Sequence, residues 1–235
     1  MNTSKAVHFF NAFAPSVAYM EVENRDGDVE IGSGYHIGDG VFVTARHVID
    51  VPKIKEIGTT IHKKDTTSSS AIFSARGKRI IKMLRGPFFH PNKDVDVACF
   101  ITDAIDLPAV PLGTHLDDWL GDDMILHSTL ILGYPPIPMA AEPTLITSIA
   151  QVNAIIDKYT GGHPHFIMST MARGGFSGGL CLNEYGFSMG VITESLTKNN
   201  LPTELGYLAV INIEPVYTCL EHHNIMPKEA ENNFS

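Results

Sequence analysis

The chain has 235 residues, of which 44% are hydrophobic and 18% charged. This balance excludes an intrinsically disordered protein, and no apolar run approaches the roughly 20 residues of a membrane-spanning helix. The formal net charge of −9 argues against general nucleic-acid binding. The three cysteines are too few, and odd in number, for a disulfide framework, and they favour a reducing compartment: Cys99, Cys181 and Cys219.

The N-terminal stretch lacks the pattern of a signal peptide, because His8, Asn11 and Pro15 interrupt its apolar residues. We therefore expect it to belong to the folded protein and the protein to be cytoplasmic, with no membrane association.

Short alternating segments separated by turn residues dominate the first half. Asn24–Asp28 and Gly38–Gly40 have the composition of tight turns. Six strands with such spacing are typical of a closed barrel. The predicted strands are 16–23, 29–37, 41–44, 71–74, 79–84 and 95–101.

A linker rich in proline, glycine and acidic residues is predicted between residues 107 and 123, and a second series of strands follows it. A helix is predicted from Glu214, with Pro215 in its first turn, before a polar tail from Pro227. The predicted fold is all-β, with two six-stranded antiparallel barrels (residues 1–110 and 111–235) and a short C-terminal helix. The predicted strands of the second barrel are 124–132, 144–154, 165–169, 180–182, 189–194 and 207–213.

The segment Gly174–Gly179 holds Ser177 within a run of glycines flanked by apolar residues. Glycines let the backbone adopt unusual conformations and let another molecule approach. An exposed serine beside bare amides suits an acyl-transfer nucleophile. Taken alone, the segment is equally compatible with an ordinary tight turn.

A serine nucleophile needs a base, and histidine has a suitable pKa. His47 follows the predicted strand 41–44 directly, where a rigid barrel would hold it. For the group that orients the histidine, Asp94 and Asp96 both precede an apolar strand, and spacing alone does not separate them.

The order of these residues resembles that of the trypsin-like serine peptidases of the chymotrypsin fold, and is closest to the bacterial HtrA-type branch. Gly32-Ser-Gly-Tyr precedes Thr44-Ala-Arg-His-Val, and Asp96-Val-Ala-Cys matches the Asp-aliphatic-Ala-aliphatic run of that branch, whereas Asp94 does not. The likeness extends from about Ser16 to Pro215.

The resemblance implies that His47, Asp96 and Ser177 form a catalytic triad. The backbone N–H groups of Gly175 and Ser177 would form the oxyanion hole. It implies an acyl-enzyme mechanism with protein or peptide substrates and without a metal or organic cofactor.

The chain also departs from the family. Phe176 and Leu180 replace the usual Asn or Asp before the serine and Pro after the second glycine. Activation by N-terminal cleavage is therefore not expected, and the oxyanion loop must be ordered in another way. The chain is also too short for the PDZ domain that HtrA enzymes usually append. A regulatory partner protein or a collapsed oxyanion loop are alternative ways to restrain such an enzyme.

By the same resemblance, Met171, Ala172, Ile192 and Thr193 would bind substrate. Met171 stands where trypsin-type pockets carry an acid, so we expect cleavage after small or medium aliphatic residues. Arg173 or His165 could instead favour acidic or polar side chains.

Three other interpretations compete for parts of the chain. The region Lys53–Lys93 holds ten Lys and Arg against two acids, a net charge of +8. These are either solvated strand edges or a docking patch for an acidic partner. His163, His165, His222 and His223 lack the partners of a tetrahedral metal site and are better explained as structural. The alternative function is a catalytically silent protein-binding module with a protease fold.

Overall fold

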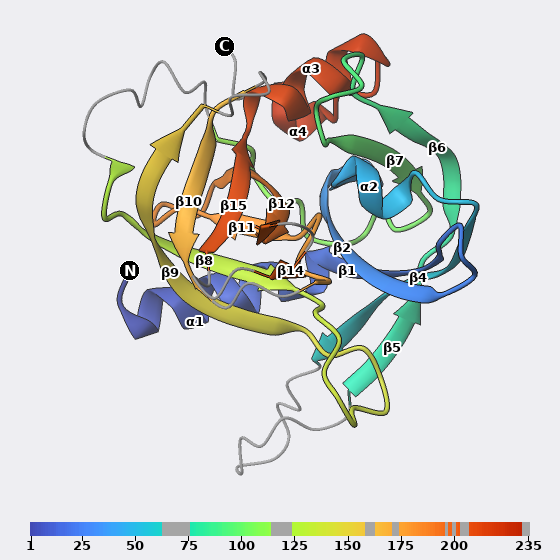
Figure 1. Ribbon diagram of the computed structural model, residues 1–235, viewed down its shortest axis with the longest axis horizontal. Coiled ribbons are helices and arrows are strands. Elements are labelled where there is room, and N and C mark those ends of the chain that lie inside the picture. The colour runs from blue at the N-terminus through green and yellow to red at the C-terminus, as the bar shows by residue number, and fades with distance from the viewer. Residues whose placement is uncertain are drawn as a thin grey trace.

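The computed structural model describes residues 1–62, 76–113, 124–157, 163–170, 174–195, 197–198, 201–202 and 207–231. Two antiparallel β-sheets lie against each other, and helices cover their ends (Figure 1). The first sheet has the strand order β5-β4-β1-β2-β3-β7-β6. Its strands are β1 (Val17–Glu23), β2 (Val29–Gly38), β3 (Val41–Thr44), β4 (Lys53–His62), β5 (Arg76–Ile80), β6 (Met83–Phe89) and β7 (Ala98–Thr102).

The second sheet is a closed six-stranded barrel in the order β10-β15-β12-β11-β8-β9. The predicted all-β class, with this barrel and a short C-terminal helix, is confirmed. Two further strands, β13 (Thr197–Lys198) and β14 (Leu201–Pro202), pair only with each other. The barrel strands are β8 (Ser128–Gly133), β9 (Ile146–Ile156), β10 (His165–Ser169), β11 (Leu180–Leu182), β12 (Ser188–Ser195) and β15 (Tyr207–Asn212).

The first sheet differs in detail from the prediction, since it has seven strands and remains open. Strand β4, which carries Lys53 and Lys55 next to Ile54, was not predicted, because charged residues break its apolar alternation. The strand predicted at residues 79–84 spans the end of β5 and the start of β6. The one predicted at residues 71–74 lies outside the described residues.

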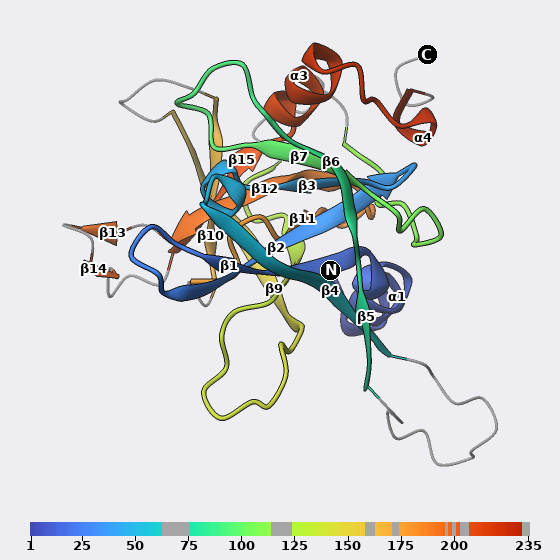
Figure 2. The same cartoon turned by 90° about the vertical axis from the view of Figure 1, so that its right-hand side faces the viewer.

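The helices nearest the two ends of the described chain pack against distant segments. Helix α1 (Thr3–Phe13) is capped by Asn2, whose side chain accepts from the Lys5 N–H at 2.9 Å. Its Phe9 lies against Gly186 in the hairpin between β11 and β12. Helices α3 (Glu214–His222) and α4 (Lys228–Glu231) lie together at one end of the molecule beside the first sheet (Figure 2). The His223 ring bonds the Phe89 carbonyl at 2.7 Å.

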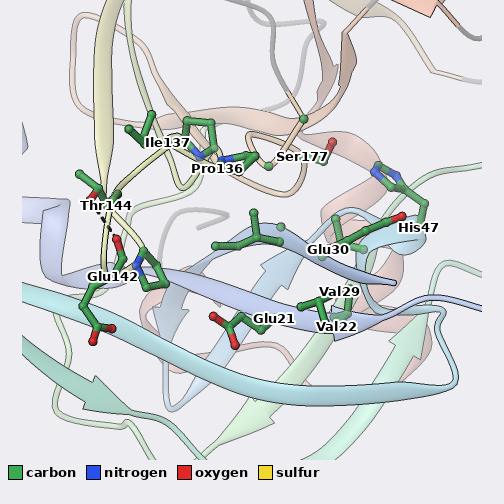
Figure 3. Close-up of a pocket in the computed structure, with 18 of the residues that line it drawn as sticks. Glu21, Val22, Val29, Glu30, His47, Pro136, Ile137, Glu142, Thr144 and Ser177 are labelled. Carbon is green, nitrogen blue, oxygen red and sulfur yellow. Dashed lines mark hydrogen bonds between the residues drawn. The ribbon is translucent and has the colours of Figure 1, made fainter. Parts of the chain in front are cut away.

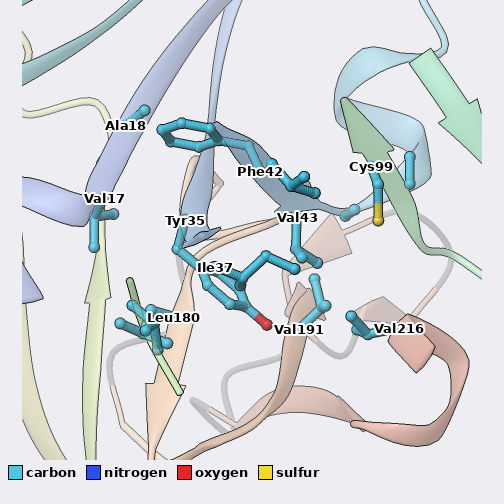
Figure 4. Packing of buried hydrophobic residues seen from close by; sticks show 14 of the residues in the cluster. Val17, Ala18, Tyr35, Ile37, Phe42, Val43, Cys99, Leu180, Val191 and Val216 are labelled. Carbon is cyan, nitrogen blue, oxygen red and sulfur yellow. The ribbon is translucent and has the colours of Figure 1, made fainter. Parts of the chain in front are cut away.

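One hydrophobic core spans both sheets and reaches α3. Figure 4 shows side chains from the first sheet packed against Leu180, Val191 and Val216. Within this core the Tyr35 hydroxyl on β2 bonds the Ser188 hydroxyl at 3.0 Å and the Gly190 carbonyl at 3.2 Å. The two sheets are therefore fixed to each other by buried apolar and polar contacts.

All three cysteines are buried with free thiols. No helix among the described residues is long and apolar enough to cross a membrane.

Several charges of the region Lys53–Lys93 are paired with acids. Lys55 contacts Glu23 at 3.1 Å, and Arg79 contacts Asp106 at 2.6 Å. Because both acids lie outside that region of the sequence, its net charge of +8 overstates the local charge in the fold.

Candidate active site

The glycine-rich segment forms the loop between β10 and β11 and carries Ser177, which is half-buried. Gly178 has a φ of +81°, and a Cβ there would overlap the Ser33 carbonyl and the Thr44 hydroxyl. Gly175 has a φ of +91°, and its Cβ would lie 2.6 Å from the Tyr134 carbonyl oxygen. Only glycine combines this backbone with such close packing, so these glycines set the position of the serine.

Phe176 anchors this loop. Its side chain is 1% exposed and belongs to the core cluster of the second barrel. It packs so closely on Gly133 that a Cβ there would lie 2.8 Å from its ring. Phe176 occupies the position before the serine where related peptidases usually have Asn or Asp. Its buried ring holds the loop against the core of the second barrel.

Ser33 on β2 also binds this loop, and it joins the two sheets. Its hydroxyl donates to the Gly175 carbonyl at 2.6 Å and accepts from the Tyr134 N–H at 2.8 Å. Its backbone N–H donates to the Ser177 carbonyl at 2.8 Å. Ser33 is completely buried. The residues on both sides of Phe176 are therefore fixed to the first sheet.

His47 lies in the short helix α2 (Arg46–Ile49), directly after β3. Asp96 holds it through both carboxylate oxygens: Oδ2 lies 2.7 Å from His47 Nδ1, and Oδ1 accepts from the His47 backbone N–H at 2.9 Å. A carboxylate accepts, so Nδ1 donates, and Nε2 is the unprotonated nitrogen of the neutral imidazole.

The two aspartates that spacing could not separate occupy different places. Asp94 is exposed, and its backbone N–H bonds the Asn92 side chain at 3.0 Å. Asp96 lies two residues before β7 and turns towards α2. The structure thus brings Asp96 to the histidine, as the resemblance implied.

Ser177 and His47 lie at the same end of a cavity between the sheets (Figure 3). In this conformation the Ser177 hydroxyl donates to the Thr193 carbonyl on β12 at 3.2 Å. Neither the Gly175 nor the Ser177 N–H donates to another residue in the described part of the chain.

The residues predicted to bind substrate have mixed positions. Met171, Ala172 and Arg173 lie outside the described residues. The Ile192 side chain is fully buried in the core cluster with Phe176, and its backbone pairs with Gly178 and Gly179. Thr193 is also buried, and its carbonyl contacts Ser177. Their role in substrate binding stays a prediction.

Of the other histidines considered for substrate or metal binding, His165 is structural in its contacts. His165 is buried on β10, and its Nδ1 bonds the His163 carbonyl at 2.8 Å. The described residues contain no group of three or more side chains arranged to hold a metal ion. Ser33 is the site residue that the sequence analysis did not single out, although it stands inside the Gly32-Ser-Gly motif.

A two-sheet β fold of this kind, with a histidine–aspartate pair facing a serine in a glycine loop, defines the chymotrypsin-fold class of serine endopeptidases. The model of the trypsin-like peptidase domain matches residues 32–191. The chain therefore belongs to the trypsin-like peptidase family. No curated protein matches it by sequence.

Solved structures with the same fold include several bacterial proteases. An HtrA-type protease, AlgW, with a tripeptide aligns at a TM-score of 0.62 and 18% identity, over 93% of this chain and 62% of that one. The Rv3671c protease from M. tuberculosis in its active form aligns at a TM-score of 0.61 and 16% identity, over 91% of this chain and 82% of that one. The serine endoprotease from Yersinia pestis aligns at a TM-score of 0.61 and 18% identity, over 96% of this chain and 67% of that one. This chain thus spans less than two thirds of AlgW.

Proposed function

We propose that this chain hydrolyses peptide bonds in proteins or peptides through a covalent acyl-enzyme on Ser177. His47 takes the proton of the Ser177 hydroxyl as that oxygen attacks the scissile carbonyl. The same imidazole then delivers the proton to the leaving amine. Water, deprotonated by His47, hydrolyses the acyl-enzyme and frees the serine.

The observation that carries this proposal is the double contact between Asp96 and His47. One carboxylate oxygen binds the ring at 2.7 Å, and the other binds the backbone of the same residue at 2.9 Å. The contact to Nδ1 sets the tautomer and the direction of the ring, and the contact to the backbone N–H holds the carboxylate in place beside it. A carboxylate so placed also stabilises the imidazolium that forms during attack.

The hydroxyl of Ser177 has to exchange its present acceptor for the imidazole. Its bond to the Thr193 carbonyl is 3.2 Å long, which is at the long end for a hydroxyl donor. We propose that a rotation about χ1 redirects it to His47. We further propose that the N–H groups of Gly175 and Ser177 stabilise the oxyanion. Each such donor contributes roughly 3 kcal/mol to catalysis in well-studied enzymes.

Fluorophosphonate labelling followed by peptide mapping tests this function. We expect modification of Ser177, and loss of both labelling and peptide cleavage in Ser177→Ala and His47→Ala. Asp96→Asn should keep the fold and lower kcat by about 10⁴-fold, because the histidine then takes the wrong tautomer. An unmodified Ser177 in folded protein would contradict the proposal and leave a protein-binding module.

A further inference from the structure

The cavity that begins at Ser177 and His47 is much larger than the reacting groups need. It has a volume of about 570 Å³ and extends between the β1–β2 hairpin and the segment 135–144, which connects β8 with β9 (Figure 3). Pro136 and Ile137 lie on one side of it, and Glu21, Val29 and Glu30 lie on the other.

The proposed mechanism indicates which half of the substrate this cavity holds. His47 delivers a proton to the leaving amine, so the leaving half of the substrate must pass over His47. The cavity is lined by His47 and the adjacent Val48, whereas no described residue of β12 lines it. Strand β12 instead contacts Ser177 through Thr193. The cavity is therefore on the leaving-group side.

The carboxylates among the described lining residues of this cavity give it an acidic character. Three glutamates line it (Glu21, Glu30 and Glu142), and none of its described lining residues is Lys or Arg. Lys78 lies 3.7 Å from Glu142 and partly compensates it. Glu30 accepts instead from the neutral Asn24 side chain at 2.7 Å, which leaves its negative charge in place.

Glu30 is the acid nearest to the reacting groups along the strand. Residues two apart in a strand share a face, so Glu30 points to the same side of β2 as Gly32. Val48, the neighbour of His47, packs directly on Gly32. Glu21 pairs with Ile31 on β2 and so takes the other face of the hairpin. The two acids can thus meet successive side chains of an extended peptide, which alternate in direction.

Apolar side chains complete the cavity. Val29 is 58% exposed and Ile137 is 36% exposed, so both offer apolar surface to a bound side chain. Lys and Arg combine an aliphatic stem with a charged end, and so suit apolar walls with carboxylates beyond them. The hollow on the other side of His47 offers no such preference, because Arg25, Arg46 and Lys93 line it together with three aspartates.

We propose that this cavity binds the leaving half of the substrate and selects Lys or Arg within the first three residues after the cleaved bond. The inference rests on the proposed function, since it takes Ser177 as the point of cleavage. The overall charge of −9 acts in the same direction, because it attracts basic substrates over a longer range.

Internally quenched peptides that differ only at the second residue after the cleaved bond test this selection. With Lys in place of Glu there, we expect kcat/KM to be about tenfold higher, because a partly exposed ion pair is gained and a like-charge contact is lost. The double variant Glu21→Gln with Glu30→Gln should reduce the ratio to below about threefold. High salt should weaken the preference in the wild type. Glu221→Gln, on the exposed face of α3, removes a single negative charge far from the cavity and should leave the ratio unchanged.

A binding measurement separates this inference from the proposed function. Fluorescently labelled peptides with Lys or Glu after the scissile position are titrated against Ser177→Ala, which needs no turnover. Tighter binding of the Lys peptide that disappears in the Glu21, Glu30 double variant supports the inference. Equal binding, or a Lys preference that survives in the double variant, overturns it even if Ser177 is labelled by a fluorophosphonate.

Discussion

At the scale of single residues, Ser33 bears on catalysis without touching the reacting atoms. It joins β2 to the carbonyls of Gly175 and Ser177 and to the N–H of Tyr134. Three contacts from one buried residue fix the loop on which the nucleophile and the proposed oxyanion donors are carried. We therefore regard Ser33 as a positioning residue.

Ser33→Ala should lower kcat by roughly ten- to a hundredfold with little change in KM, because small displacements of reacting groups are costly. The buried Tyr134 N–H and Gly175 carbonyl would lose their partner, which should cost about 1–3 kcal/mol of the free energy of unfolding. Ser16→Ala is the matched control. Its hydroxyl is equally buried and donates to the Pro108 carbonyl at 2.6 Å, so stability should fall and kcat should not. Equal effects of the two variants on kcat would contradict the positioning role.

Phe176 has a related role through packing. Phe176→Ala should lower the free energy of unfolding by about 3–5 kcal/mol and also slow the labelling of Ser177 in protein that is still folded. Phe166→Ala removes another buried ring of the same cluster and should destabilise without a comparable change in labelling rate. Rates measured well below both melting temperatures would test this. Unaltered labelling in Phe176→Ala would mean that the loop is ordered without its anchor.

At the scale of elements, the sequence predicted the second barrel better than the first sheet. Segments such as Val41–Thr44 and Leu180–Leu182 are short and wholly apolar, and they form strands as predicted. Strand β4 was not predicted because its charged residues pair with charges on other strands, Lys55 with Glu23 on β1 and Glu56 with Lys78 on β5. Such pairing cannot be seen in one segment. Helix α1 could have been found, since Ala6, Phe9, Phe10 and Phe13 follow helical spacing after Asn2.

The sequence predicts those site residues that stand in recognisable motifs and in a characteristic order along the chain. His47 and Asp96 were named from the sequence, and the structure brings them together. The contributions of Ser33 and Phe176 depend on contacts between residues more than a hundred positions apart, or on packing inside the second barrel. Local patterns contain no information on such contacts. The acidic cavity likewise forms only when the β1–β2 hairpin faces the segment 135–144.

The contact between β2 and β12 leads to a prediction about cooperativity. Tyr35→Phe removes a buried hydroxyl that bonds the Ser188 hydroxyl and the Gly190 carbonyl. Because the Ser188 hydroxyl also donates to that carbonyl at 3.3 Å, the loss should cost about 0.5–1.5 kcal/mol of the free energy of unfolding. Because one core spans both sheets, unfolding in denaturant should remain a single transition. Tyr185→Phe, at a 56% exposed side chain, should have little effect. Two separate transitions in the wild-type protein would contradict this view of a shared core.

At the scale of the whole molecule, buried histidines make stability depend on pH. Burial lowers the pKa of His36 and of His90. His36 is held in its neutral form, with Nε2 accepting from the Gly40 N–H at 3.0 Å and Nδ1 at 3.0 Å from the Pro108 carbonyl. The unfolded chain therefore binds more protons than the folded one as the pH falls below about 6.5, the usual histidine pKa.

We expect the free energy of unfolding to be constant near pH 7.5 and to decrease between pH 7 and 5.5. His36→Gln, which cannot titrate, should show a shallower decrease. Urea unfolding at several pH values measures both slopes. A stability that rises on acidification in this window would contradict the burial of neutral histidines.

The proposed function requires that the hydroxyl oxygen of Ser177 is acylated and that His47 makes this hydroxyl reactive. Rapid acid quenching of the protein during reaction with p-nitrophenyl acetate, followed by mass spectrometry of its peptides, measures this directly. We predict an acetyl group on Ser177 that forms quickly in the wild type and far more slowly in His47→Ala. An acetyl group on another residue, or equal rates in the two proteins, would contradict the account.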